Sequence, residues 1–360
     1  MSQKVSKMTR LGNYFSGEFK VYFYQRGENR QIIPVNSPVK NLKAKEKLNV
    51  IRGKYWDEIP SNFRERWNEV KLFETTGNLE KAHSIILDIE KGPYDLNNKL
   101  NHLTGKEWTK FTCSWFIFNA LPSDLKEEKD LSIGLEKHPA TYSPTMISDF
   151  IRFFTKEGMS VLDPFLGIGT TLEACKRTGR IGYGMEVNPK YFEISKNRAI
   201  QFSQNIFNHD SRNIKQFYKP NSFDFCISSP PYWDVLNRST DNFENSRSSR
   251  GFDVKYSNSY FDLGNIEDYE VFLDTLSNIY FDIFDLMKFG SYTVIVIKNV
   301  KKGKKMYPLA WDLAKNLSKK YELKDEKIWI QDKVGLSPYA YPYSWASNIL
   351  HHYCLIFRKE

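Results

Sequence analysis

The sequence predicts an α/β protein built on a parallel sheet flanked by helices, with a basic extension ahead of it. From about residue 145 onward, short apolar runs alternate with helical patterns, and that alternation is typical of parallel sheets. The expected strands cover residues 160–163, 181–186, 223–228, 292–298, 328–330 and 353–357. A chain of 360 residues is long enough for one large domain, or for a catalytic domain with an appendage.

Helices are expected between these strands. Residues 146–155 form one before the first strand, and a second follows the glycine-containing loop after it. Apolar residues that recur at steps of three and four predict an amphipathic helix over 272–286. Residues 237–258 interrupt the pattern as a polar loop directly after a strand, which is where ligands usually bind in such sheets. The first hundred residues have weak periodicity, and no fold is predicted for them.

The basic excess of the chain lies at its start. The net charge is +9, and residues 1–56 hold twelve Lys/Arg against three acids, whereas the remainder carries 40 of each sign. Six aromatic residues are interleaved in the basic segment: Tyr14, Phe15, Phe19, Tyr22, Phe23 and Tyr24. A basic, aromatic-rich segment suits a polyanion such as nucleic acid, although the solvated face of a small subdomain would look the same.

Several classes of protein are disfavoured by composition. No apolar run approaches the roughly 18 residues of a membrane span, and no apolar stretch follows the charged start as it would in a secretory signal. The four cysteines, at 113, 175, 226 and 354, form no CxxC pair, which disfavours a zinc site and a disulfide framework. The expectation is a cytoplasmic protein with no membrane partner and no metal.

A glycine-containing loop after the first strand indicates nucleoside binding. Gly167 and Gly169 let the backbone pass close to a ligand, and the helix after them presents free N–H groups. Glu186 ends the next strand about 20 residues later, where an acid can accept both ribose hydroxyls. Ordinary turns and solvent-facing acids give the same pattern. NAD would also fit, but the Asp163-Pro-Phe opening and Leu172 in place of a third glycine disfavour it.

Three further polar residues could contact the same ligand. Asp210 could accept a hydrogen bond from an adenine amino group, or it could be an ordinary surface acid. Thr141 or Ser143, just before the helix at 146–155, could bind a carboxylate. Capping of that helix is the alternative role for both residues.

The strand at 223–228 runs into Ser229-Pro-Pro-Tyr-Trp233. Two consecutive prolines exclude a helix and withhold two backbone donors, so their carbonyls are available as acceptors. The Ser229 hydroxyl and the Pro230 carbonyl could grip an exocyclic amino group, while Tyr232 stacks on the base that carries it. Such a base must first be flipped out of the duplex. Proline-rich loops can contain the same Ser-Pro-Pro-Tyr sequence, but its position directly after a buried strand favours a catalytic role.

Four segments resemble the motifs of the amino-group DNA methyltransferases, which transfer methyl from S-adenosyl-L-methionine to cytosine N4 or adenine N6. These segments are HPATYSP (138–144), DPFLGIGTT (163–171), MEVNP (185–189) and SPPYW (229–233). The resemblance covers roughly residues 100–360. It implies a Rossmann-like seven-stranded sheet, mostly parallel, with a terminal antiparallel hairpin. It also implies double-stranded DNA as the substrate and, in a restriction-modification system, a cognate endonuclease acting on the same site.

The resemblance also implies roles for individual residues. The catalytic set is Ser229, Pro230, Pro231 and Tyr232. The cofactor set is Thr141, Asp163, Phe165, Gly167, Gly169, Thr170, Thr171, Glu186 and Asp210. Serine at the head of SPPY, where adenine enzymes usually have Asp or Asn, resembles the cytosine-N4 branch. An adenine-N6 enzyme, an RNA methyltransferase and a non-catalytic nucleic-acid binder are the alternatives. Methylation of a ring carbon is excluded, because no cysteine follows a proline.

The cofactor motifs precede the catalytic motif, and no long recognition insert separates them. DNA recognition is therefore expected from the basic N-terminal region, residues 1–100, from the loop at 234–265 within the catalytic domain 101–360, or from both. Phosphate contacts would position the enzyme while a few side chains read base edges. The candidate contacts are Arg238, Arg247 and Arg250 near the target base and, unless they form only a lysine-rich turn, Lys301, Lys302, Lys304 and Lys305.

Overall fold

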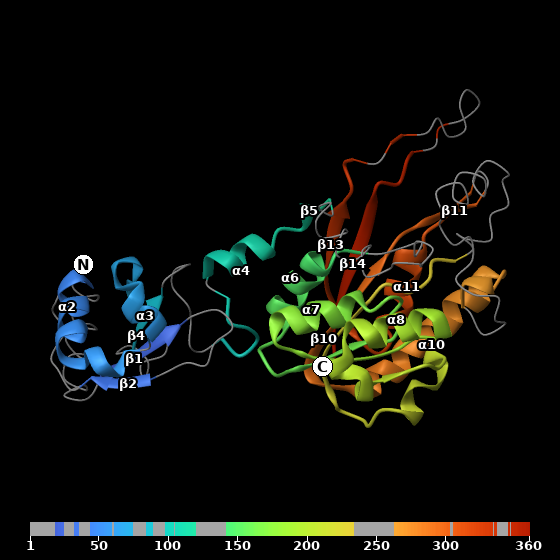
Figure 1. The fold of residues 1–360 in the computed structure, drawn as a ribbon. Helices are drawn as coiled ribbons and strands as arrows, with labels where there is room; N and C mark the ends of the chain where they lie inside the picture. The colour runs from blue at the N-terminus through green and yellow to red at the C-terminus, as the bar shows by residue number, and fades with distance from the viewer. Residues whose placement is uncertain are drawn as a thin grey trace. The chain divides into compact units, whose positions relative to one another are not determined.

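The computed structural model divides the chain into two compact units, Met1–Thr112 and Cys113–Glu360 (Figure 1). The structure describes residues 19–24, 32–35, 44–59, 61–74, 84–88, 98–103, 105–119, 142–233, 263–302, 305–333, 335–336, 345 and 347–360. Within these residues no helix has the length and apolar character needed to cross a membrane.

The N-terminal unit contains a four-stranded sheet in the order β2-β1-β4-β3. Strand β1 pairs antiparallel with β2 and parallel with β4, and β3 pairs antiparallel with β4. Ile51, Ile59 and Phe63 are buried in this unit. The elements are β1 (Phe19–Tyr24), β2 (Ile32–Val35), α2 (Ala44–Tyr55), η1 (Trp56–Glu58), α3 (Ser61–Glu65), η2 (Trp67–Glu69), β3 (Lys71–Glu74), β4 (Ser84–Asp88) and α4 (Gly105–Phe111).

The second unit is built on an eight-stranded sheet in the order β5-β13-β14-β10-β9-β6-β7-β8. Every pairing is parallel except the two made by β14, which runs antiparallel to both β10 and β13. The strands are β5 (Trp115–Ile117), β6 (Ser160–Asp163), β7 (Ile181–Met185), β8 (Ile206–Phe207), β9 (Phe223–Ser228), β10 (Met287–Ile297), β13 (Glu322–Ile330) and β14 (His351–Arg358). The expected mostly parallel sheet with a terminal antiparallel hairpin is confirmed, and β5 adds an eighth strand at the edge.

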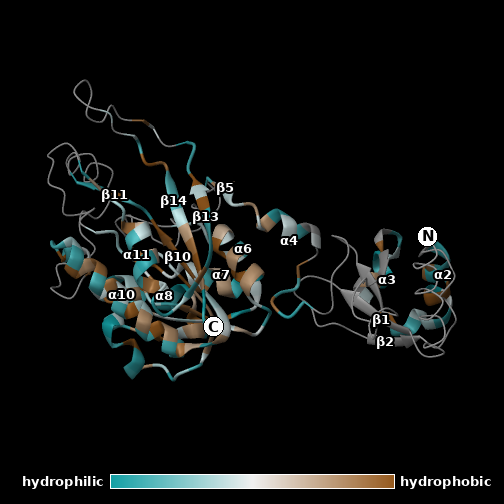
Figure 2. Ribbon diagram, turned by 180° about the vertical axis from the view of Figure 1, so that it is seen from behind, coloured by the Kyte–Doolittle hydropathy of each residue, from teal (hydrophilic) through white to brown (hydrophobic). Residues whose placement is uncertain are grey.

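Helices cover both faces of this sheet. On one face, Phe154 of α6 (Pro144–Phe154) stacks on Phe225 of β9, with ring centroids 5.2 Å apart. On the other face, α10 (Tyr269–Leu286) and α11 (Leu309–Leu317) share one buried cluster with Ile295 and Leu355 of the sheet. Figure 2 shows apolar residues along α6 and the central strands. The other elements are α7 (Thr170–Thr178), α8 (Pro189–Arg198), η4 (Ile200–Asn205), η5 (Ser211–Gln216), η6 (Leu263–Asn265), β11 (Val300–Lys302) and β12 (Lys305–Tyr307).

The topology gathers one kind of loop at one edge of the sheet. Strands β6, β7, β9 and β10 are mutually parallel, so the loops that leave their carboxyl ends meet at the same edge. The segments after β6, β7 and β9 contain the candidate site residues predicted from the sequence. They are the glycine loop at 163–171, Glu186 and the segment 229–233. That edge is where ligands bind in open α/β sheets.

Candidate active site

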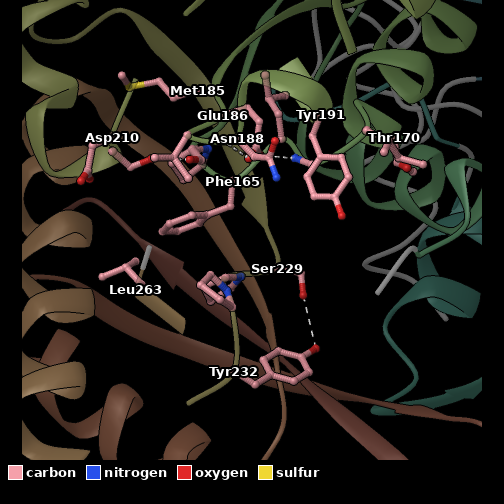
Figure 3. Close-up of a pocket in the computed structure, with 18 of the residues that line it drawn as sticks. Phe165, Thr170, Met185, Glu186, Asn188, Tyr191, Asp210, Ser229, Tyr232 and Leu263 are labelled. Atoms are coloured by element: carbon pink, nitrogen blue, oxygen red, sulfur yellow. Dashed lines mark hydrogen bonds between the residues drawn. The ribbon is translucent and has the colours of Figure 1, made fainter. Parts of the chain in front are cut away.

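One pocket opens at this edge of the sheet and encloses about 910 Å³, counting its open mouth. In Figure 3, Phe165 lies between a row of residues that includes Glu186 and Asp210 and a second row that includes Ser229 and Tyr232. The pocket is lined by Tyr142, Pro164, Phe165, Leu166, Gly167, Ile168, Thr170, Met185, Glu186, Val187, Asn188, Tyr191, Asp210, Ser211, Ser229, Pro230, Pro231, Tyr232 and Leu263.

Glu186 is held at the end of β7 by backbone groups. Its two carboxylate oxygens accept hydrogen bonds from the Gly167 N–H at 2.7 Å and the Asn188 N–H at 2.9 Å. Gly167 has a φ of +52°, a conformation that glycine adopts without the strain a Cβ would add. These hydrogen bonds join the acid to the glycine loop, and Glu186 lines the pocket.

Asp163 and Thr171 lie behind the pocket wall and do not line it. Both are 0% exposed, and the Thr171 hydroxyl donates to Asp163 Oδ2 at 2.5 Å. The Tyr142 hydroxyl donates to the same oxygen at 3.2 Å, and the Phe165 N–H donates to Oδ1 at 3.0 Å. Burial raises the pKa of the Asp163 carboxyl to about 6, against the opposite effect of these hydrogen bonds. Asp163 therefore fixes the shape of the loop and the position of Tyr142.

Gly169 also lies outside the pocket lining. It caps the start of α7 with a φ of +82°, and a Cβ placed on it would come within 2.8 Å of the Ser195 Cβ in α8. Its role in the structure is the close approach of two helices. The segment on either side of it does contact the pocket, through Phe165 and Gly167 before it and Thr170 after it.

Asp210 lines the pocket while it caps η5. Its side chain accepts from the Arg212 N–H at 2.9 Å and pairs with the Arg212 guanidinium. Ser143 caps α6, because its hydroxyl accepts from the Thr145 N–H at 3.1 Å. The capping alternative is therefore observed for Ser143. Thr141 lies outside the described residues, as does most of the loop at 234–265, so their roles stay predictions.

The segment 229–233, which the sequence predicts to be the catalytic loop, lies at the other end of the pocket. Ser229, Pro230, Pro231 and Tyr232 all line it, and the Ser229 and Tyr232 hydroxyls lie 3.3 Å apart. Figure 3 shows these two side chains directed toward each other. Trp233 instead points into the protein, where it is 2% exposed and packs on Tyr307 with ring centroids 4.5 Å apart. Trp233 anchors the loop and does not wall the pocket.

Several lining residues are not predicted from the sequence. Tyr142 and Asn188 fall inside the motif segments HPATYSP and MEVNP, but the motifs assign no role to either residue. Their position in the sequence could have indicated them, because residues that flank the carboxyl end of a strand usually lie near the bound ligand in such sheets. Tyr191 and Ser211 belong to the next helical elements, α8 and η5. No motif pointed to them.

The pocket residues fit a nucleoside-containing cofactor. A carboxylate has about four acceptor positions, so Glu186 can accept ribose hydroxyls while the loop amides hold it. Phe165, Met185 and Leu263 supply apolar surface beside it, as a flat purine ring requires. The two carboxylates, Glu186 and Asp210, also suit a ligand that carries positive charge. No group of three or more His, Cys, Asp or Glu arranged to hold a metal occurs in the part of the chain that the structure describes.

A family model described as DNA methylase, covering N6 and N4 methyltransferases, matches residues 16–197, about half of the chain. The chain belongs to this DNA methylase family. Enzymes of this family use S-adenosyl-L-methionine, which is therefore the cofactor of this chain, and the pocket's acids and apolar surface agree with that ligand. The family model leaves open whether a cytosine N4 or an adenine N6 is methylated.

Curated relatives match over shorter stretches. The type II methyltransferase M2.LlaDCHI of Lactococcus lactis subsp. cremoris is 39% identical over 188 residues, which cover 40% of this chain and 70% of that protein. The type II methyltransferase M.Cfr9I of Citrobacter freundii is 43% identical over 69 residues, 19% of this chain and 23% of that protein. The chain thus matches about a quarter of the length of M.Cfr9I.

Solved structures resemble the chain more distantly. TrmN from Thermus thermophilus superposes with a TM-score of 0.40 and 15% identity over 62% of this chain and 50% of its own. A methyltransferase from Pyrococcus furiosus superposes with a TM-score of 0.37 and 19% identity over 66% of this chain and 96% of its own. The family assignment rests on the sequence matches alone.

Proposed function

We propose that the protein is a DNA methyltransferase that transfers a methyl group to N4 of a cytosine flipped out of double-stranded DNA. The observation that carries this proposal is the shared pocket. Ser229, Pro230 and Tyr232 line one end, and Glu186 and Asp210 line the other. A methyl donor bound at the acidic end and an amino group held at the serine end would be placed side by side.

The residues at the serine end orient the amino group. The Ser229 hydroxyl and the Pro230 carbonyl accept its two hydrogens, which directs the nitrogen lone pair toward the centre of the pocket. When bound, S-adenosyl-L-methionine supplies a methyl group that is already strongly electrophilic. The main task of the protein is therefore positioning, and well-oriented reactants can gain about 7–11 kcal/mol from it. The proton leaves to water along the hydroxyls of Ser229 and Tyr232.

Tyr232 stabilises the flipped base by stacking. Flipping costs a few kcal/mol, and stacking of a base on an aromatic ring returns about 1–3 kcal/mol. The ring is well supported for this work, because the next residue, Trp233, is buried between aromatic neighbours. A loop fixed at Trp233 holds Tyr232 in place before the base arrives.

The choice of cytosine rests on Ser229. The residue at this position resembles the cytosine-N4 branch of the family, in which serine replaces the Asp or Asn usual in adenine enzymes. We also propose that the protein acts as the modification enzyme of a type II restriction-modification system, because its relatives M2.LlaDCHI and M.Cfr9I are named as type II methyltransferases. A cognate endonuclease acting on the same DNA site would then be its partner.

Nucleoside analysis of methylated DNA tests the base assignment. Plasmid DNA would be isolated from a host without methylases of its own that expresses the full chain, digested to nucleosides and analysed by mass spectrometry. The expected product is N4-methylcytosine, absent from DNA of a host that carries the empty vector. N6-methyladenine alone would overturn the cytosine assignment, and methylated RNA with unmodified DNA would overturn the DNA assignment.

A further inference from the structure

A row of three side chains crosses the sheet edge beside the catalytic loop. In the pairing of β13 with β14, Trp329 faces His352. In the pairing of β10 with β14, Ile297 faces Tyr353, so the next pair places Lys298 opposite His352. Residues directly opposite each other in an antiparallel pair lie on the same face of the sheet. Trp329, His352 and Lys298 therefore share one face, the one turned away from α10 and α11.

This row adjoins the residue that is expected to stack on the base. The His352 ring lies 6.0 Å from the Tyr232 ring and stacks on Trp329 with centroids 4.5 Å apart. On the parallel side, Ser228 of β9 faces Ile295 of β10. Strand β9, which leads into the segment 229–233, and strand β10, which ends one residue before Lys298, are therefore direct neighbours at the same edge.

Two groups in this row lack partners. Lys298 is half-buried, and its ammonium makes no hydrogen bond or ion pair with any residue that the structure describes. His352 is 9% exposed, and its Nδ1 atom is buried without a hydrogen-bond partner within the described part of the chain. Buried polar groups are nearly always hydrogen-bonded. Unpartnered groups beside a pocket therefore indicate a ligand that supplies the missing partner.

The charge in the row comes from Lys298 alone. Burial, with smaller contributions from the nearby Lys298 ammonium and from His351, lowers the pKa of His352 to about 3. Burial also lowers the pKa of His351, with a smaller contribution from Lys298. Both imidazoles are neutral at physiological pH. The row thus presents one ammonium beside a flat, neutral aromatic surface.

We propose that Lys298 reads the target base by donating a hydrogen bond to the 2-carbonyl oxygen of the flipped cytosine. The Watson–Crick edge of cytosine carries the amino group at one end and this oxygen at the other. With the amino group on Ser229 and Pro230, the oxygen would lie toward the neighbouring strand β10, which ends one residue before Lys298. Strands are spaced about 4.8 Å apart, a step that a base edge spans. Adenine has no carbonyl to offer there, so Lys298 would favour cytosine.

A phosphate group fits this position less well. Phosphates of a bound duplex stay at the protein surface, whereas Lys298 lies in a row with the nearly buried His352. The exposed Lys302 and Lys305, on the neighbouring strands β11 and β12, are better placed for phosphates. The inference about Lys298 rests on the proposed cytosine-N4 function and adds a residue that determines its base specificity.

The test uses the full chain and two versions of one duplex that carries the methylation site mapped from plasmid DNA. One version holds cytosine at the target position, and the other holds a 2-aminopyridine C-nucleoside, which keeps the amino group but has no carbonyl. For the wild type, kcat/KM should fall about 10- to 100-fold with the second duplex, the value of a hydrogen bond to a charged group. Lys298→Met should lose a similar factor with cytosine and almost nothing more with the analogue.

Two further variants complete the test. Lys298→Arg should retain part of the preference, because it keeps a positive donor, and Lys319→Met, an exposed lysine on the opposite edge, should behave as wild type. Cofactor affinity should be unchanged in all of them. A wild type that methylates both duplexes equally well overturns the inference even if every variant unfolds. N6-methyladenine as the product would overturn the proposed function, and the inference with it.

Discussion

The two units of the chain differ in what they contribute. The N-terminal unit carries 20 Lys/Arg against 13 acids, whereas the second unit, Cys113–Glu360, is nearly balanced with 32 against 30. The second unit holds the pocket and its catalytic loop. The excess positive charge and the pocket therefore lie in separate parts of the chain. Changes in one unit should alter DNA affinity and its salt dependence, and changes in the other should alter turnover.

The largest effect is expected from the catalytic loop. Ser229→Ala should lower methyl transfer about 100-fold or more, as when one oriented hydrogen-bonding group is removed from a reacting centre. Cofactor affinity should stay within a few-fold, because the proposed partner of Ser229 is the base and not the cofactor. Single-turnover transfer of labelled methyl groups and calorimetric titration with the cofactor would measure the two quantities.

The preceding serine is a matched control for this change. Ser228 is 0% exposed, and its hydroxyl lies 2.8 Å from the Tyr280 hydroxyl in the core. Ser228→Ala should cost stability, about 1 kcal/mol for a lost buried hydrogen bond, and little turnover. If both variants lost activity equally, Ser229 would have no special role in methyl transfer. The loss of activity would then reflect a folding defect in the second unit.

The next effect concerns the pH dependence of stability within the catalytic unit. Burial raises the pKa of Asp163 from 3.8 to about 6. The folded state therefore binds this proton more tightly than the unfolded state does. The resulting stability is fully present below pH 3.8 and is lost as pH rises through 6, a change of about 3 kcal/mol.

Asp163→Asn removes this titration. The free energy of unfolding of the variant minus that of the wild type should therefore rise between pH 4 and pH 7, as measured by urea denaturation. Taking the difference cancels the other carboxyl groups, including Asp224 and Asp285, whose pKa values are lowered by lysine partners. A difference that does not change with pH would show that Asp163 is not a buried acid.

A smaller effect is expected at the acidic end of the pocket. Glu186→Gln keeps the size of the side chain but leaves one acceptor oxygen where two now bind the Gly167 and Asn188 amides. Cofactor affinity should fall about 10- to 100-fold, the value of a hydrogen bond to a charged group. Calorimetry would measure it, with Glu173→Gln as a control on α7, where Glu173 pairs with Lys176 and Arg177 and does not line the pocket. Equal affinities for both variants would place the cofactor elsewhere.

The sequence predicts the centre of the catalytic unit well because its signals there are local. The strands at 160–163 and 223–228 are buried apolar runs, and the structure gives them the same bounds. Strand β13 begins earlier than expected because residues 322–326 are exposed and carry no apolar pattern. Strand β10 also begins earlier, since its first part contains a shift in register with β9. The ends of strands and the bulges within them depend on contacts with neighbouring strands, and the local hydrophobic pattern of the sequence does not contain that information.

The sequence predicts the pocket residues best where the type of side chain itself suggests a ligand contact. Ser229, Tyr232 and Glu186 all reach the pocket. Asp163 and Gly169 occur in the same motif, yet their positions depend on Tyr142 and Ser195, which are distant in sequence. A motif therefore marks residues that hold a loop in shape as well as residues that touch a ligand. Only the packing separates the two roles.

The smallest effect is expected in the N-terminal unit, where it tests the comparison most directly. Lys45 and Lys54 are exposed on α2, whereas Lys47 on the same helix is 5% exposed and is left unchanged. If the two exposed lysines contact phosphates, changing both to Gln should flatten the slope of log K against log salt by up to about 1.8, at roughly 0.9 per contact. The melting temperature and the methylated base should not change, because neither side chain is buried and the catalytic loop lies in the other unit. Fluorescence anisotropy with labelled duplex DNA at several salt concentrations would measure the slope.

The control changes Lys319 and Lys324, exposed lysines of the catalytic unit, to Gln. A slope that flattened equally in the control would mean that DNA binding follows total charge and that the basic unit has no separate role.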